Sequence, residues 1–93
     1  MPVHNADITT VLEEIADLLE IQGANPFRVR AYRNAARILG DLPQEARLLV
    51  ERGDDLTRVP GIGSALAGKI SEISTTGHCS LLDRLHRELP PDD

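Results

Sequence analysis

Apolar side chains recur every three or four positions along most of this chain, which is the spacing of one buried face of an α-helix. The clearest repeat runs from Ala6 to Gln22, where Asn5 offers an N-cap and Gly23 a C-terminal stop. Six aliphatic residues carry the repeat: Ile8, Val11, Leu12, Ile15, Leu18 and Leu19. We therefore predict an amphipathic first helix with an acidic outer face.

A second helix is predicted to start at Asn25, with Pro26 in the first helical position, and to end at Gly40. Its expected buried stripe consists of Phe27, Ala31, Ala35, Ile38 and Leu39. Tyr32 falls between this stripe and a basic face that carries Arg30, Arg33 and Arg37. The three alanines at 31, 35 and 36 would let a neighbouring helix approach closely, so this helix is expected to be central to the packing.

The rest of the chain predicts shorter helices separated by glycine and proline. A third helix is expected from Leu42 to about Arg52, with Leu48, Leu49 and Val50 inward, followed by one helical turn at 54–58 capped by Asp54 or Asp55. A proline–glycine hairpin at 60–63 leads into a helix at about 63–76 with Leu66, Ala67, Ile70 and Ile73 inward. Ser80 caps a last helix in which Leu81, Leu82, Leu85 and Leu89 pack. No strand pattern is found, so we expect an all-α fold: one domain, residues 1–93, a compact bundle of five or six short helices with one helix-hairpin-helix motif at about 55–76.

The amino-acid composition indicates what kind of core the protein has and where in the cell it is found. Phe27 and Tyr32 are the only aromatic residues, so the core must be aliphatic, and the single cysteine, Cys79, cannot form an internal disulfide. No apolar run approaches the length of a membrane span, and the N-terminus lacks the pattern of a signal peptide. We expect a soluble, cytoplasmic protein, associated with the nucleoid if it is bacterial.

Charge is distributed unevenly along the chain. The net charge is −5, which argues against a protein that coats nucleic acid, yet residues 26–40 contain four arginines and no acid: Arg28, Arg30, Arg33 and Arg37. Residues 1–25 contain five acids and no lysine or arginine: Asp7, Glu13, Glu14, Asp17 and Glu20. The arginines predict a phosphate-facing patch, and the alternative is that they pair with the acids of the first helix.

The hairpin is the second candidate for phosphate binding. Glycines at 61 and 63 let the backbone turn tightly and let another molecule come close. The amides of Ile62, Gly63 and Ser64 would lie at the start of the next helix, unpaired and at the positive end of its dipole. This arrangement binds phosphate, although the same glycine pattern also occurs in plain helix–helix turns.

Two motifs in this order, Asn25-Pro26-Phe27-Arg28-Val29-Arg30-Ala31-Tyr32-Arg33-Asn34-Ala35-Ala36 and Val59-Pro60-Gly61-Ile62-Gly63, followed by Thr76-Gly77, carry a resemblance. The chain resembles the N-terminal helix-hairpin-helix domain of family X DNA polymerases, of the bacterial and archaeal type, which corresponds to the lyase domain of polymerase beta. The resemblance extends from about Asn5 to Leu89. It implies a module that binds gapped, nicked or broken DNA in repair without reading sequence, alone or beside a larger repair enzyme.

The resemblance also implies roles for single residues. The hairpin amides of Gly61 and Gly63 would hold a backbone phosphate, with Ile62, Ser64 and Arg33 adding contacts, while Arg28 and Tyr32 match positions that line a pocket for a 5′-phosphate and its sugar. A monovalent cation, Na⁺ or K⁺, would lie among the backbone carbonyls of Thr57, Val59 and Ile62; no other cofactor is required.

Lys69, the only lysine, stands where the family's lyase domain carries a nucleophile that forms a Schiff base with an abasic sugar. Lysine suits this chemistry because its amine can lose its proton beside cationic neighbours such as Arg28 and Arg33, whereas arginine stays charged. Gly68, Ser64 and Ala65 replace a glutamate and two lysines of polymerase beta. The alternative is an exposed lysine paired with Glu72 one turn on.

Three functions therefore remain open. A DNA-binding module leads, a 5′-deoxyribose-phosphate lyase acting through Lys69 is the enzymatic alternative, and a protein-interaction module is the third, favoured by the net charge and the acidic first helix. The chain has no acidic pair placed for two-metal nucleotidyl transfer, so we expect no polymerase activity from it. His78, Cys79 and His86 fit no standard zinc spacing.

Overall fold

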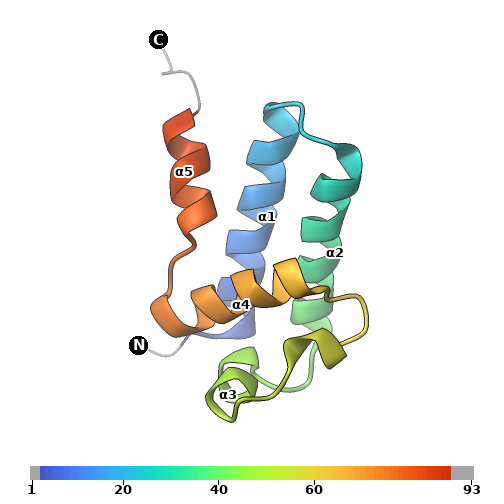
Figure 1. The fold of residues 1–93 in the computed structure, drawn as a ribbon, viewed down its shortest axis with the longest axis vertical. Coiled ribbons are helices and arrows are strands. Elements are labelled where there is room, and N and C mark those ends of the chain that lie inside the picture. Colours follow the sequence, from blue (N-terminus) through green and yellow to red (C-terminus); the bar gives the residue numbers. More distant parts are fainter. Residues whose placement is uncertain (1–2, 89–93) are drawn as a thin grey trace.

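The two longest helices, α1 (Asn5–Ile21) and α2 (Pro26–Asp41), pack side by side as an antiparallel pair (Figure 1). The computed structural model describes residues 3–88, and over that range it contains helices and turns only. Gly23 ends α1 with a φ of 73°, and the N–H of Ala24 donates to the carbonyl of Leu19 across that end. Asn25 then caps α2 as predicted, because its side chain accepts from the N–H of Phe27 at 2.9 Å.

The remaining helices close around this pair. α3 (Ala46–Glu51) and the 3₁₀ turn η1 (Leu56–Arg58) lie at one end of it, α4 (Ser64–Thr76) crosses it, and α5 (Ser80–Glu88) runs along α1 on the side away from α2 (Figure 1). Gly53 and Gly77 end α3 and α4 with φ values of 78° and 76°. The all-α prediction is confirmed. Leu89, expected to pack with α5, lies outside the described residues.

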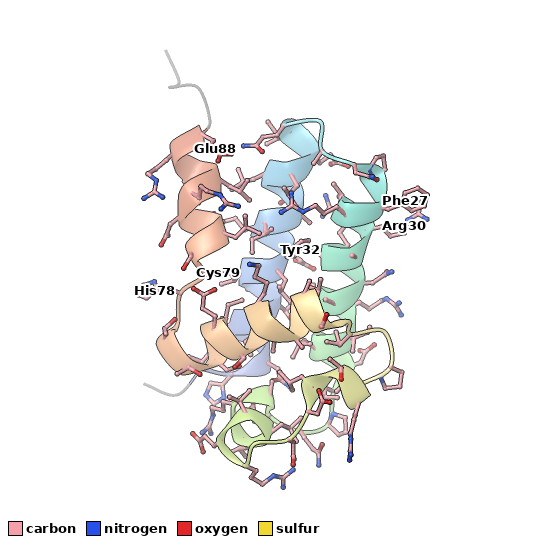
Figure 2. The ribbon with its side chains drawn as sticks, in the orientation of Figure 1. Phe27, Arg30, Tyr32, His78, Cys79 and Glu88 are labelled. Atoms are coloured by element: carbon pink, nitrogen blue, oxygen red, sulfur yellow. The ribbon has the colours of Figure 1, made fainter. Side chains whose placement is uncertain are left out.

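The core is aliphatic, as the composition requires, with one aromatic exception. Ile8, Leu12, Ile15 and Leu19 of α1 are almost fully enclosed. The prediction for α2 is partly wrong: Phe27 is 75% exposed, and Val29 and Tyr32 are buried in its place together with Ala35, Ala36 and Leu39. The buried stripe thus lies to one side of the predicted one, and Tyr32 lies on the side of α2 that faces α1 (Figure 2).

Two boundaries differ from the sequence-based prediction. α3 begins at Ala46 rather than Leu42, and Leu48 is exposed, whereas Leu49 is buried and Val50 packs partly buried against the core, as predicted. Asn5 is the first residue of α1 and not its cap. Its side chain caps α3 instead, with Oδ1 accepting from the N–H of Ala46 at 2.8 Å and Nδ2 donating to the carbonyl of Gln44 at 2.7 Å.

Candidate functional site

The hairpin between η1 and α4 is held in place by its own packing. Ile62 is buried, and its N–H donates to the carbonyl of Val59 at 3.0 Å. Gly61 has a φ of 92°, and a Cβ added there would lie 2.5 Å from Cδ1 of Ile38 on α2. Glycine at 61 is therefore favoured by the backbone conformation, while the end of the Ile38 side chain would have to move to admit a Cβ.

Gly63 is different, because nothing among residues 3–88 requires a glycine there. Its φ of −83° and ψ of 175° are open to any residue, and an added Cβ would meet no atom within 4 Å. The residue is exposed and is the N-cap of α4. The space over this position is free for another molecule to reach the backbone.

The first turn of α4 has unpaired amides. The first intrahelical hydrogen bond is from the N–H of Ala67 to the carbonyl of Gly63, at 2.9 Å. Among residues 3–88, no acceptor is found for the N–H groups of Ser64, Ala65 and Leu66, Gly63 supplies no side-chain cap, and the first turn holds no acid. The positive end of the α4 dipole therefore faces outward without a partner.

The other helix starts in the described part of the chain each have a side-chain acceptor. The acceptors, with the N–H that each one binds, are Asp7 for His4, Asn25 for Phe27, Asn5 for Ala46, Asp55 for Thr57 and Glu72 for Ser80. Three of these five are carboxylates. The fold thus supplies an anion or amide oxygen at each of these ends and leaves α4 without one.

The arginines of α2 are divided between two roles. Arg33 forms ion pairs with Asp17 at 3.0 Å and Glu20 at 3.3 Å, so for this residue the alternative of pairing with the first helix holds. The guanidinium of Arg30 lies 5.9 Å from the ring centre of Phe27, and both side chains project from the outer side of α2 (Figure 2). The structure shows no ion pair within residues 3–88 for Arg28, Arg30 or Arg37.

Tyr32 is a core residue with a polar edge. It is 4% exposed, and burial raises the pKa of its hydroxyl, while the guanidiniums of Arg28 and Arg84 act in the opposite direction. Cys79, itself buried, is the third neighbour that influences this hydroxyl. Tyr32 therefore cannot offer its ring as a stacking surface in this conformation, and only its hydroxyl, beside Arg28, is placed to meet a ligand.

Lys69 lies on α4, half-buried, one turn before Glu72. The pKa of Glu72 is lowered, mainly by hydrogen bonds from the Ser80 side chain and backbone, and to a smaller extent by the Lys69 charge. The neighbour of Lys69 that the structure identifies is thus a carboxylate, as the alternative of an ordinary paired lysine requires. Arg33, which we expected to lower the basicity of Lys69, is paired with α1 instead.

Cys79 is close to both Tyr32 and Glu72. It helps to raise the pKa of the Tyr32 hydroxyl and to lower the pKa of the Glu72 carboxyl, the acidic neighbour of Lys69. No local sequence signal predicts this, because a lone cysteine carries no information about its neighbours.

The carbonyls of Thr57, Val59 and Ile62 belong to the segment that runs from η1 through the hairpin to α4. The Val59 carbonyl accepts one hydrogen bond, from Ile62, and a carbonyl oxygen has a second lone pair. The Thr57 side chain is bound to Asp55 at 2.6 Å. Hard oxygen donors of this kind suit a monovalent cation, so the residues present are compatible with one.

His86 and His78 form hydrogen bonds with other residues of the fold. His86 of α5 lies 3.1 Å from Glu14 of α1, and the backbone of His78 exchanges hydrogen bonds with the Thr76 hydroxyl. Within residues 3–88, no three histidine, cysteine or acidic side chains come together as a metal site. Over the same range, no helix combines the length and the apolar character that crossing a membrane demands.

Comparison with known proteins supports the resemblance. A family model described as a helix-hairpin-helix domain matches residues 3–79. The chain is similar to the DNA polymerase/3'-5' exonuclease PolX of Bacillus subtilis (strain 168), with 40% identity over 88 residues. The match covers 95% of this chain and 15% of that relative, so the chain spans only a small part of the relative's length.

Proposed function

The chain belongs to the helix-hairpin-helix domain family, and from that premise we propose that it is a DNA-binding module that holds a backbone phosphate at the first turn of α4. The observation that carries the proposal is the set of unpaired amides at Ser64, Ala65 and Leu66 beside the open Gly63. Backbone amides at the positive end of a helix dipole bind phosphate directly. The similarity to a DNA polymerase supports DNA as the source of that phosphate.

Binding of this kind is independent of base sequence, because phosphate contacts position a protein on DNA without reading it. Arg28 and Lys69 would add charge to the interface. Arg33 would add less, since Asp17 and Glu20 already neutralise it. A monovalent cation on the carbonyls of Thr57, Val59 and Ile62 would hold the turn and offset the phosphate charge. Gapped or nicked DNA is the expected substrate, since a break offers an end phosphate and flexible, unpaired DNA that intact duplex lacks.

The proposal is tested by fluorescence anisotropy with gapped, nicked and intact duplexes of the same sequence. We expect tighter binding to the gapped form. With two or three phosphate contacts, raising salt from 50 to 200 mM should weaken binding roughly 10- to 40-fold. Absence of binding to gapped DNA at low salt would end the proposal.

Gly63→Asp and Gly63→Asn form the matched pair of variants for this test. Both side chains can cap α4, and both fit the open space at this position. Aspartate also repels phosphate, so we expect Gly63→Asp to reduce affinity about 30-fold or more and Gly63→Asn to reduce it by a smaller factor. Equal, unreduced affinity in both variants would remove the α4 amides from the interface.

Lyase chemistry through Lys69 is a second candidate, and the Arg28 guanidinium beside the Tyr32 hydroxyl, the two residues expected to line a sugar-phosphate pocket, favours it. The Lys69 amine would add to the C1′ aldehyde of a 5′-deoxyribose phosphate and expel water to form a Schiff base. A base would then remove a proton from C2′, so that a double bond forms between C2′ and C3′ as the bond between C3′ and the phosphate oxygen breaks, and water would finally release the unsaturated sugar from Lys69. Borohydride trapping on an incised abasic duplex tests this; equal trapping by Lys69→Ala, or none by the wild type, would reject it.

A further inference from the structure

The outer side of α2 carries a row of exposed polar residues. Arg30, Asn34 and Arg37 follow one another at intervals of four and three positions, so they lie along one face of the helix. This face is opposite to the one that buries Tyr32 and Leu39. We call these three exposed residues the outer stripe of α2.

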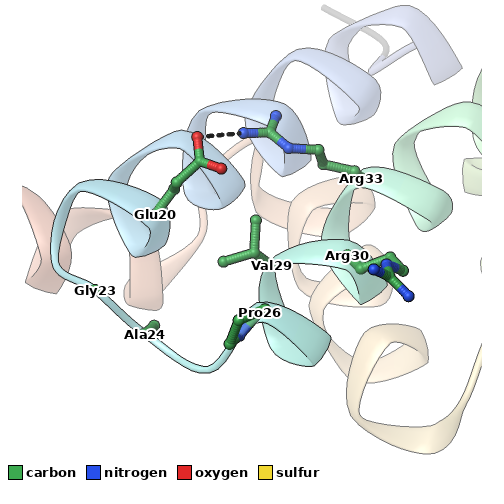
Figure 3. A pocket seen from close by; sticks show the side chains of 7 residues that line it. All are labelled: Glu20, Gly23, Ala24, Pro26, Val29, Arg30 and Arg33. Carbon is green, nitrogen blue, oxygen red and sulfur yellow. Dashed lines mark hydrogen bonds and ion pairs between the residues drawn. The ribbon is translucent and has the colours of Figure 1, made fainter.

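The two arginines of this stripe have no carboxylate partner in the described part of the chain. At the hollow in the corner between α1 and α2, Arg33 turns toward Glu20, whereas Arg30 points away from it (Figure 3). Asp41 lies one turn beyond Arg37, and no ion pair joins the two. The stripe therefore presents two positive charges that the described residues leave uncompensated.

Phe27 positions one of these arginines. The Phe27 side chain is 75% exposed, and the Arg30 guanidinium lies 5.9 Å from the centre of its ring. A cation at this distance from an aromatic face is attracted to it. The contact restrains the Arg30 guanidinium on the outer side of α2, where a ligand can reach it (Figure 2).

The hairpin meets α2 at one end of the outer stripe. Gly61 lies against Cδ1 of Ile38, the residue that follows Arg37. α4 begins beside this half of α2 and runs away from it toward α5, so its first amides face the side on which Phe27 and Arg30 project (Figure 1 and Figure 2). Arg30 lies eight positions before Ile38, which is about 12 Å along an α-helix. Stacked nucleotides advance by about 3.4 Å each, so about four of them span this distance.

A nucleic-acid strand matches the outer stripe better than an acidic segment of a protein does. The stripe adjoins the amides of α4, where we place a phosphate, and a strand carries a further negative charge at every nucleotide. Asn34 can bind a phosphate or a sugar between the two arginines. Protein partners are instead anchored by apolar and aromatic side chains in pockets, and the three residues of the stripe offer polar groups only.

We propose that the DNA strand held at the first turn of α4 continues along the outer stripe of α2, with successive phosphates on Arg37 and Arg30. This inference rests on the proposed phosphate site at α4 and extends it to a track of about four nucleotides. The track lies on the other side of α2 from Tyr32, and so it differs from the pocket that the family resemblance implies. An unpaired strand, such as a gap provides, can follow the helix in this way.

The test compares a thymidine dinucleotide with a thymidine octanucleotide, each titrated against ¹⁵N-labelled protein at low salt. The dinucleotide can occupy the α4 site but is too short to reach Arg30. We expect both ligands to shift the backbone signals of Gly61–Leu66. Only the octanucleotide should also shift the side-chain N–H signals of Arg30 and Asn34.

Arg30→Gln is the decisive variant, because the position is exposed and glutamine is as good a helix former as arginine. Loss of one phosphate contact should weaken octanucleotide binding about three- to tenfold at about 50 mM salt and make the salt slope shallower by about 0.7. Dinucleotide binding should stay within about twofold of wild type. Arg87→Gln is the matched control: it removes the same charge from an exposed position on α5 that has no ion pair in the described part of the chain, and both ligands should bind it within about twofold of wild type.

Two outcomes would overturn the track and leave the α4 site standing. In one, the octanucleotide shifts Gly61–Leu66 and the side chain of Arg28 but not that of Arg30, so that the strand follows the other edge of α2. In the other, Arg30→Gln weakens octanucleotide binding no more than Arg87→Gln does. Absence of any shift at Gly61–Leu66 would remove the proposed phosphate site and the track with it. A glutamate octapeptide that shifts the Arg30 side chain at lower concentration than the octanucleotide does would assign the stripe to an acidic protein.

Discussion

The starts of α4 and α5 have similar local sequences and opposite surroundings. Each helix begins at a serine, Ser64 in α4 and Ser80 in α5. At α5 the carboxylate of Glu72 accepts from both the backbone N–H of Ser80, at 3.0 Å, and its hydroxyl, at 2.5 Å. At α4 the described residues provide no acceptor for the first amides.

The start of α5 shows which kind of group binds the first amides of a helix in this protein. Glu72 brings an anionic oxygen from the middle of α4 to the amide of the next helix, and the bond lowers the pKa of its carboxyl. A phosphate oxygen at Ser64 would be the same kind of partner, supplied from outside. We call the start of α5, which has an acceptor, the filled site, and the start of α4, which has none among the described residues, the open site. The substitutions below test each of them.

The largest effect on stability is expected from a substitution in the hairpin that positions the free amides of α4. Gly61→Ala should lower the free energy of unfolding by about 1–3 kcal/mol, because alanine is strained at positive φ and the end of the Ile38 side chain must move to make room for its Cβ. Gly53 has a similar φ of 78° but no atom within 4 Å of an added Cβ, which makes Gly53→Ala the matched control, at about 1–2 kcal/mol. Urea denaturation followed by circular dichroism measures both. Equal losses would mean that contact with α2 does not hold the hairpin.

Removal of the acceptor at the start of α5 should lower the free energy of unfolding by a smaller amount. Glu72→Ala removes the acceptor at α5, and we expect a loss of about 1–2 kcal/mol, the usual size of an N-cap. The same denaturation experiment applies, with Glu13→Ala as the control, since the Glu13 side chain is exposed and has no hydrogen bond or ion pair within residues 3–88. A loss no larger than that of Glu13→Ala would mean that the Glu72 cap adds nothing to stability.

Lowering the pH should gradually reduce the stability that the Glu72 cap contributes to the fold. The pKa of Glu72 is lowered in the folded state, so its contribution is present above its ordinary pKa and is lost as pH falls through the lowered value. The stability difference between wild type and Glu72→Gln should therefore be largest near neutral pH and shrink below about pH 4.5, where the unfolded chain begins to bind protons first. Thermal melts of both proteins between pH 3 and 7 measure it. A difference that grows with acidity would contradict the direction of the shift.

The sequence predicted the helices better than it predicted their faces and caps. Periodicity and glycine stops located α1, α2, α4 and α5 to within a residue or two, because these signals are local. The exposure of Phe27 and the burial of Tyr32 were missed, since the two residues are five positions apart and both suit the edge of the apolar stripe. Which of them enters the core depends on where α1 packs against α2, and no local pattern contains that information.

For the candidate site, too, the sequence predicted the local features and missed the contacts between distant residues. The turn at Pro60–Gly63 and the free amides after it follow from the local sequence, and the structure has both. Capping across the fold does not: Asn5 serves α3 from forty positions away, and Glu72 serves α5. The pairing of Arg33 with α1 was only one of two alternatives, because charge patterns show which residues are available to pair and not which ones meet.

The smallest expected effect is the most informative about the open site. Gly63→Asp should raise the free energy of unfolding by about 0.5–1 kcal/mol, because aspartate at an N-cap accepts from the free amides and favours the positive end of the dipole. The same substitution should weaken DNA binding, so stability and affinity would change in opposite directions. Thermal melts and anisotropy on one protein preparation measure both. If Gly63→Asp adds no stability, the amides of α4 are not free, and the contrast with α5 on which the proposed phosphate site depends does not exist.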